Sequence, residues 1–238
     1  MSTAHALSIT RPLSGNFLKL IAALTMLLDH IGVMFFPQHS IFRILGRLAF
    51  PIFAFMIAEG CHYTRNRLRY FLSIFLLGAL CQTVYYVFSR DTYLNILLTF
   101  SCSIPLIYLL QEWKVRKNWL FMFPFAAAVA VAFVLNQYVT LDYGFWGMMV
   151  PVFTALCYPS RDKKLGAGHH ILAVCLLGVG LLLLAIDYEG VQYYSLLTLP
   201  LLLLYSGKRG KGNFKYAFYL FYPLHLVALQ AIAWLLTQ

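Results

Sequence analysis

Apolar residues come in blocks of about 15 to 23 along this chain, separated by short polar or charged segments. A hydrocarbon layer about 30 Å thick is crossed by about 20 apolar residues in a helix that rises about 1.5 Å per residue. The blocks therefore predict nine membrane-spanning helices. The sixth and eighth blocks are short and compatible with re-entrant or tilted segments, so eight spans is the alternative. The nine blocks lie at about 17–36, 42–62, 68–89, 93–111, 118–139, 143–158, 167–186, 191–206 and 214–236.

Composition supports the same fold class. The 238 residues are 61% hydrophobic and only 11% charged, whereas a soluble domain carries about 25% charged residues. These values predict an all-α, polytopic transmembrane helix bundle. They exclude a soluble domain, a disordered chain and a secreted disulfide scaffold, and they argue against a nucleic-acid partner despite the net charge of +10. No repeat or long linker divides the chain, so residues 1–238 are expected to form a single domain.

The basic residues explain the positive charge as a topology signal. Most Lys and Arg residues fall in the segments that nine spans with a cytoplasmic N-terminus place inside the cell, as the positive-inside rule requires. The opposite loops collect Asp91, Asp142, Asp187 and Glu189. This pattern predicts a multi-pass membrane protein with its N-terminus in the cytoplasm. The segment SGKRGKGNF at 206–214 lacks the spacing of a phosphate-binding P-loop, and we interpret it as a cytoplasmic anchor.

A few ionisable residues lie inside the predicted spans. A charge at the centre of a membrane helix costs about 2.5 to 3.5 kcal/mol on insertion scales, so such residues usually face a cavity or a partner and are functional candidates. They are concentrated in the first, second and last spans: Asp29, His30, Arg47, Glu59 and His225.

The charged residues of the first two helices can be paired by their depth in the membrane. Counting residues from the helix ends places Asp29 level with Arg47, and Lys19 level with Glu59, so two ion pairs are expected. In an alternative, purely structural role, these ion pairs reduce the cost of inserting charged residues into the membrane and hold the two helices of the hairpin together. Pro51 is expected to kink the second helix near Arg47, because a proline removes the hydrogen bond to the carbonyl four residues earlier.

Lys19 and His30 suggest a binding path for a long ligand. Eleven residues separate them, so they share one helix face at a distance of about 16 Å along the axis. A cation at the cytoplasmic mouth can hold a phosphate group while the histidine meets the far end of the ligand. His225 lies at a similar depth in the last span and either lines the same cavity or packs against neighbouring tyrosines.

Several motifs resemble the TraX family, which is known for conjugal pilin acetylation and is similar to the wider group of integral-membrane acyltransferases. The first two are specific: KLIAALTMLLDHIG, ending at Gly32, and RILGRLAFPIFAFMIAEG at Arg43–Gly60, which is followed by the basic TRNRLRY. DYGFWG at Asp142–Gly147 and FYPLH at Phe221–His225 add to the pattern. Such acyltransferases place a basic residue, usually arginine, ten intervening positions before an essential histidine. Lys19 and His30 reproduce this spacing with lysine.

The resemblance implies transfer of an acetyl group from cytoplasmic acetyl-CoA to an amine or hydroxyl acceptor, such as a pilin N-terminus. Lys19 and the arginines Arg65, Arg67 and Arg69 are then the candidates for holding the CoA phosphates. His30 is the expected general base, and Arg47 polarises the thioester carbonyl. Asp29 either orients Arg47 or shapes the electric field around the imidazole. Glu59 and His225 are expected to line the substrate cavity, and no metal is expected.

Two alternatives belong to other classes. The first is a proton-coupled transporter in which Asp29, His30 and Glu59 form a relay. Inverted repeats or matched broken helices would favour transport, and none is visible in the sequence. The second is a non-catalytic membrane assembly factor in which the buried charges are structural.

Overall fold

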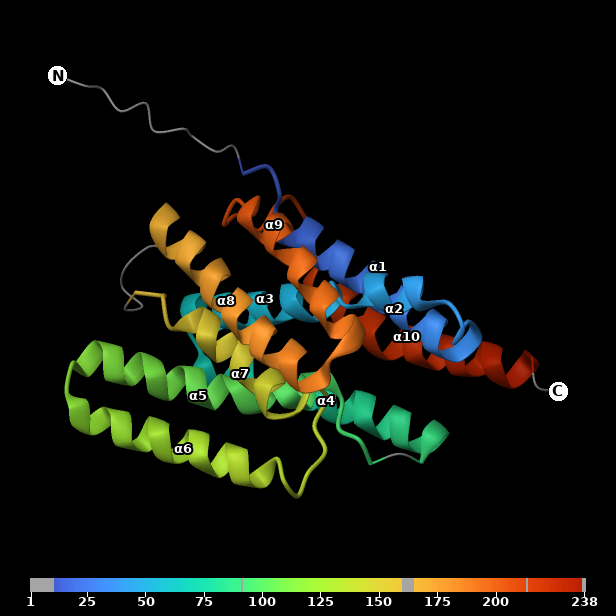
Figure 1. The fold of residues 1–238 in the computed structure, drawn as a ribbon, viewed down its shortest axis with the longest axis horizontal. Helices are drawn as coiled ribbons and strands as arrows, with labels where there is room; N and C mark the ends of the chain where they lie inside the picture. The colour runs from blue at the N-terminus through green and yellow to red at the C-terminus, as the bar shows by residue number, and fades with distance from the viewer. Residues whose placement is uncertain (1–10, 91, 160–164, 213, 237–238) are drawn as a thin grey trace.

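A computed structural model describes residues 11–90, 92–159, 165–212 and 214–236, and Figure 1 shows the arrangement of the helices. Asp91, one of the predicted outer-loop acids, lies outside these ranges. Regular structure in the described ranges is helical, with two isolated β-bridges between loops. The elements are α1 (Gly15–Phe35), α2 (Ser40–Gly46), α3 (Ala49–Tyr63), α4 (Arg67–Ser89), α5 (Ile96–Arg116), η1 (Trp119–Phe121), α6 (Met122–Leu135), α7 (Gly144–Ala155), α8 (Ala167–Tyr188), η2 (Gly190–Leu197), α9 (Thr198–Leu203) and α10 (Lys215–Leu236).

Each of the nine predicted spans contains helix, which confirms the all-α class. Among the described residues, six helical segments are long and apolar enough to cross a membrane. They are α1, α2 together with α3, most of α4, α5, α8 and most of α10. Three further apolar segments are shorter, at Trp119–Leu135, Gly144–Ala155 and Gly190–Leu203. Many large apolar side chains on the outer helix faces are exposed, as a bundle surrounded by lipid requires.

The core of the bundle is built around α3, which contacts α1, α5, α7 and α8. Ile52, Ala54, Phe55, Ala58 and Cys61 of this helix are buried. In contrast, α6 buries no residue and lies beside α5 at the edge of the molecule (Figure 1). Residues on α3 are therefore held by packing on several sides.

The second span is interrupted where the sequence predicts a kink. α2 ends at Gly46 and α3 begins at Ala49, so Arg47 lies at the junction of two helices. Pro51 falls in the first turn of α3, where a proline is tolerated because the first N–H groups of a helix have no intrahelical acceptor. Gly46 faces α1, and a Cβ there would collide with the carboxylate of Asp29. The glycine thus allows α2 to pack directly on α1.

Two isolated β-bridges join loops at opposite ends of the bundle. Leu13, before α1, bridges to Tyr205, after α9. At the other end of α1, Leu94 in the α4–α5 loop bridges to Leu141 in the α6–α7 loop. These contacts fix the loops that carry several residues of the site.

Candidate functional site

Two cavities lie one after the other along α1. The Lys19 cavity, near the start of α1, has a volume of about 400 Å³ and is lined by Lys19, Glu59 and Arg209 among others. The His30 cavity, near the end of α1, has a volume of about 480 Å³ and is lined by Asp29, His30, Arg43, Arg47, Asp142 and Tyr143 among others. Both are enclosed by α1, α3, α4, α5 and α10. Four residues line both cavities and form their common wall: Met26, Phe53, Ile96 and Tyr222.

His30 is oriented by its own helix. Its Nδ1 lies 2.9 Å from the carbonyl oxygen of Met26, one turn earlier. A carbonyl oxygen only accepts hydrogen bonds, so Nδ1 carries the proton and Nε2 of the neutral ring keeps its lone pair. Within the part of the chain that the structure describes, Nε2 has no hydrogen-bond partner. The imidazole is therefore arranged to accept a proton at Nε2.

His225 packs against His30 across the α1–α10 contact. The two ring centroids are 5.1 Å apart, with the rings inclined at 64°. His225 is not among the residues lining the His30 cavity. Its ring stacks on Phe221 and lies edge-on to Tyr222, with centroids 5.0 and 5.6 Å apart, as in the alternative in which it packs against aromatic neighbours. Its Nδ1 lies 2.9 Å from the Phe221 carbonyl oxygen, and its buried Nε2 has no hydrogen-bond partner among the described residues.

Asp29 binds two arginines. The predicted Asp29–Arg47 ion pair is present at 3.9 Å between Oδ1 and Nη2. A closer partner is Arg43, whose Nη1 donates to both carboxylate oxygens at 3.0 and 2.9 Å. The side chain of Arg43 is 37% exposed and that of Arg47 only 9%, so Arg43 is the more accessible cation.

Arg47 is held in place by groups from outside the first two spans. Its Nη1 donates to the hydroxyl of Tyr143 at 2.8 Å and to the side-chain oxygen of Gln192 at 3.2 Å. Tyr143 has a φ of 59°, in the left-handed region, and Gly144 follows with a φ of 53°. This tight turn brings the tyrosine ring over Phe50, with the ring centroids 4.3 Å apart. Arg47 is thus held by the N-cap residue of α7, by η2 and by Asp29 of α1.

Asp142 brings a second carboxylate into the His30 cavity. Its backbone is held by two hydrogen bonds of 2.9 Å, from its N–H to the Leu94 carbonyl and from the Thr99 hydroxyl to its carbonyl. Burial raises the pKa of this loop carboxyl to about 6, opposed by a hydrogen bond from Tyr93 and by the charge of Arg47. The cavity therefore contains two carboxylates of different environment, of which Asp29 is ion-paired.

The Lys19 cavity carries a different set of polar groups. Lys19 and Glu59 both line it, whereas their predicted ion pair stays a prediction. The Tyr205 hydroxyl lies 3.0 and 2.8 Å from the two carboxylate oxygens of Glu59. Arg209, from the loop after α9, reaches the same cavity from a segment remote in sequence.

The arginines that precede and begin α4 do not line the Lys19 cavity. Arg67 turns toward α5, where it binds the carboxylate of Glu112 and lies 5.0 Å from the centroid of the Tyr108 ring. Arg65 and Arg69 are exposed. The role of these three arginines in holding the CoA phosphates therefore stays a prediction, and the lining of the Lys19 cavity does not include them.

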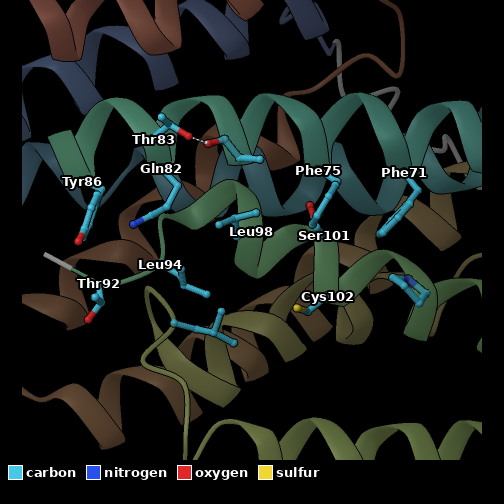
Figure 2. A pocket seen from close by; sticks show the side chains of 13 residues that line it. Phe71, Phe75, Gln82, Thr83, Tyr86, Thr92, Leu94, Leu98, Ser101 and Cys102 are labelled. Atoms are coloured by element: carbon cyan, nitrogen blue, oxygen red, sulfur yellow. Dashed lines mark hydrogen bonds between the residues drawn. The ribbon is translucent and has the colours of Figure 1, made fainter. Parts of the chain in front are cut away.

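A wider groove of about 740 Å³ lies between α4 and α5, and Figure 2 shows the side chains that line it. No charged residue is among them. The hydroxyls of Thr83 and Ser101 donate to carbonyls of their own helices, at 3.0 Å to Ala79 and 2.8 Å to Leu97. The groove is therefore an apolar surface with satisfied polar groups, and the candidate chemistry belongs to the two cavities along α1.

Sequence reasoning missed several residues of these cavities, chiefly Arg43, Asp142, Tyr143 and Arg209. Asp142 and Tyr143 open the motif DYGFWG, whose position before an apolar block does not by itself indicate a role in the site. Arg43 opens the second motif but lies near the end of its span. Arg209 lies in the segment interpreted as an anchor, and only folding brings it to α1.

Fold and site together define a class: an α-helical membrane protein with two adjoining polar cavities in its helix bundle. Within the described ranges, no group of three His, Cys, Asp or Glu side chains is arranged to hold a metal ion.

The chain belongs to the TraX family, whose model, described as TraX protein, matches residues 14–233. It is 27% identical to a probable fimbrial assembly protein FimC, serogroup H1, of Dichelobacter nodosus, over 89% of this chain and 92% of that protein. It is also 45% identical to the uncharacterized protein RP591 of Rickettsia prowazekii (strain Madrid E), over 17% of this chain and 16% of that protein. No solved structure matches.

Proposed function

We propose that the protein is a membrane-embedded acetyltransferase that moves an acetyl group from cytoplasmic acetyl-CoA to an amine or hydroxyl acceptor. In this proposal the chain crosses the bacterial inner membrane nine times with its N-terminus in the cytoplasm. The observation that carries the proposal is the pair of cavities along α1, with Lys19 in one, His30 in the other and a common wall of four side chains.

The donor enters by the Lys19 cavity. Lys19 attracts the phosphate groups at the cytoplasmic end, and the narrow thioester arm points along α1. Three of the four residues of the common wall, Met26, Phe53 and Ile96, are apolar, which suits the passage of an uncharged arm and excludes water from the thioester.

The acceptor occupies the His30 cavity. Its nitrogen or oxygen attacks the thioester carbonyl carbon while Nε2 of His30 removes its proton. The new bond to carbon forms as the carbon–sulfur bond breaks, and CoA leaves as the thiolate. The proton held by His30 is then returned to the thiolate or to water.

Charge on the carbonyl oxygen is stabilised by an arginine. The sequence assigns this role to Arg47, but its hydrogen bonds to Tyr143 and Gln192 favour a positioning role. We assign the stabilising charge to Arg43, which is more exposed and shares the Asp29 carboxylate. Asp29 holds both arginines at the cavity.

The family supports the acceptor class. TraX proteins are associated with pilin acetylation, and the relative from Dichelobacter nodosus carries the name of a fimbrial assembly protein. We therefore propose a pilin N-terminus as the acceptor. The alternative transport relay is disfavoured, because Glu59 lines a different cavity from Asp29 and His30, and their common wall offers no acid or base except the hydroxyl of Tyr222.

One assay tests the proposal. Purified protein is incubated with acetyl-CoA labelled in the acetyl group, and the wild type is compared with His30→Ala in label transfer and in CoA binding. We expect the variant to bind CoA and to lose acetyl transfer or thioester hydrolysis by about 100-fold or more, since a general base contributes about 10² to 10⁴ in rate. Undiminished turnover in His30→Ala would exclude His30 as the base, and absence of CoA binding by the wild type would favour a transporter or an assembly factor.

A further inference from the structure

The segment Ser206–Gly212, which we call the basic loop, is fastened to the start of α1. The N–H of Gly15 donates to the Lys208 carbonyl at 2.8 Å, and the N–H of Asn16 donates to the Arg209 carbonyl at 2.9 Å. The Asn16 side-chain amide donates to the Lys211 carbonyl at 3.0 Å. These hydrogen bonds join segments about 195 residues apart in sequence and fix the loop at the end of α1 that bears Lys19.

Glycines give the basic loop its shape. Gly207, Gly210 and Gly212 have φ values of 70°, 90° and 87°, a region that other residues rarely adopt. A Cβ on Gly210 would lie 2.5 Å from the Ser14 hydroxyl oxygen, so only glycine allows the loop to lie against the N-cap of α1. The loop therefore has a specific conformation, beyond what a membrane anchor needs.

The basic loop concentrates positive charge at the mouth of the Lys19 cavity. Lys208, Arg209 and Lys211 are all exposed, and Arg209 lines the cavity together with Lys19 and Asn16. The acid on the cavity wall, Glu59, is hydrogen-bonded by Tyr205. An anion at the mouth would thus contact cations from α1 and from the basic loop. Hydrogen bonds to the start of α1 hold the loop in place.

We propose that the basic loop is a binding site for phosphate groups, and that its ligand is the phosphorylated nucleotide end of CoA. This inference rests on the proposed function, since it assigns the residues that recognise the donor. Arginine and lysine bind phosphate by charge-assisted hydrogen bonds. An anionic lipid headgroup carries the same chemistry. The position of Arg209 on the cavity lining, beside Lys19, favours CoA.

Calorimetric titration of the full chain in nanodiscs of zwitterionic lipid tests the site with CoA and with dephospho-CoA, which lacks the 3′-phosphate. We expect Arg209→Gln to weaken CoA binding by about tenfold or more, the worth of one charge-assisted hydrogen bond. Gly210→Ala keeps every charge but displaces the loop, and we expect it to weaken CoA binding too. Lys117→Gln, which removes an exposed charge outside the cavity, is the matched control and should bind as the wild type does.

The outcomes separate the two proposals. Wild-type binding of CoA that is stronger than binding of dephospho-CoA, and a smaller difference in Arg209→Gln, would support the basic loop as the phosphate site. Unchanged CoA affinity in both Arg209→Gln and Gly210→Ala would overturn it while leaving the acetyltransferase proposal intact. A repeat in nanodiscs containing phosphatidylglycerol tests the lipid headgroup as the ligand. If Arg209→Gln abolished an effect of phosphatidylglycerol on the protein and left the CoA affinity unchanged, the inference would also be overturned. No CoA binding by the wild type would contradict the proposed function itself.

Discussion

At the scale of single residues, the site depends on which side chains are held and which are accessible. His30 has one ring nitrogen fixed by a backbone carbonyl and the other directed to act as an acceptor. Arg47 is clamped by Tyr143 and Gln192, whereas Arg43 binds the same carboxylate with more exposure. Residue type alone does not distinguish these two arginines. Their different surroundings do, and on that ground the proposed function assigns positioning to Arg47 and charge stabilisation to Arg43.

Asp142 makes a pH dependence of stability testable. Burial raises its pKa from 3.8 to about 6, so between these values the folded chain holds a proton that the unfolded chain releases. This contribution to the free energy of unfolding is therefore largest below about pH 4 and is lost as the pH rises through about 6. Its upper limit is about 3 kcal/mol.

Thermal unfolding in detergent from pH 4 to 7 measures this effect. We expect Asp142→Asn to show a smaller fall in the unfolding temperature across the window than the wild type. Asp187→Asn removes an exposed acid at the end of α8 and should retain the wild-type profile. Identical profiles for Asp142→Asn and the wild type would show that the buried carboxyl does not titrate as described.

At the scale of elements, close packing of α1 and α2 sets the geometry of Asp29 and its arginines. Gly46 allows this approach, because any Cβ at that position would meet the Asp29 carboxylate. We expect Gly46→Ala to lower the free energy of unfolding by about 1 to 3 kcal/mol, the usual effect of adding atoms to a packed site. The same change should reduce acetyl transfer, since it displaces Asp29.

Gly168→Ala is the matched control for that substitution. Gly168 lies near the start of α8, and a Cβ there would meet no atom within 4 Å. Its replacement should leave stability unchanged or raise it by up to about 1 kcal/mol, because alanine is the better helix former. Equal stability of Gly46→Ala and Gly168→Ala, measured by thermal unfolding, would contradict the packing described for α2.

How far the sequence predicts the elements depends on the range of the interactions. Apolar blocks identify each helical segment because burial in lipid is a local property of the chain, and the interruption near Arg47 follows from Pro51. Matched depth predicts the Asp29–Arg47 pair because a short hairpin joins its two helices. The contacts of Arg47 with Tyr143 and of the basic loop with α1 are not predicted, since they join segments remote in sequence.

At the scale of the whole molecule, the two cavities lie one after the other in the bundle, and the proposed function assigns one to the donor and the other to the acceptor. The Lys19 cavity adjoins the basic loop, and the His30 cavity adjoins the loops that carry Asp142 and Asn95. The helices that enclose both cavities are the same five, so the common wall is a continuous part of the core. The proposed function then implies that an acetyl group taken up at one face is delivered to an acceptor that enters from the opposite face.

Inverted and right-side-out membrane vesicles from the source cells, which contain the native acceptor, test this central claim most directly. Acetyl-CoA labelled in the acetyl group is added outside sealed vesicles, and labelled protein is measured before and after protease treatment. We predict labelling in inverted vesicles only, loss of the label with His30→Ala, and a labelled product that protease reaches only after the vesicles are opened. Labelling that is independent of His30, or a product digested in sealed inverted vesicles, would contradict acetyl transfer across the bundle.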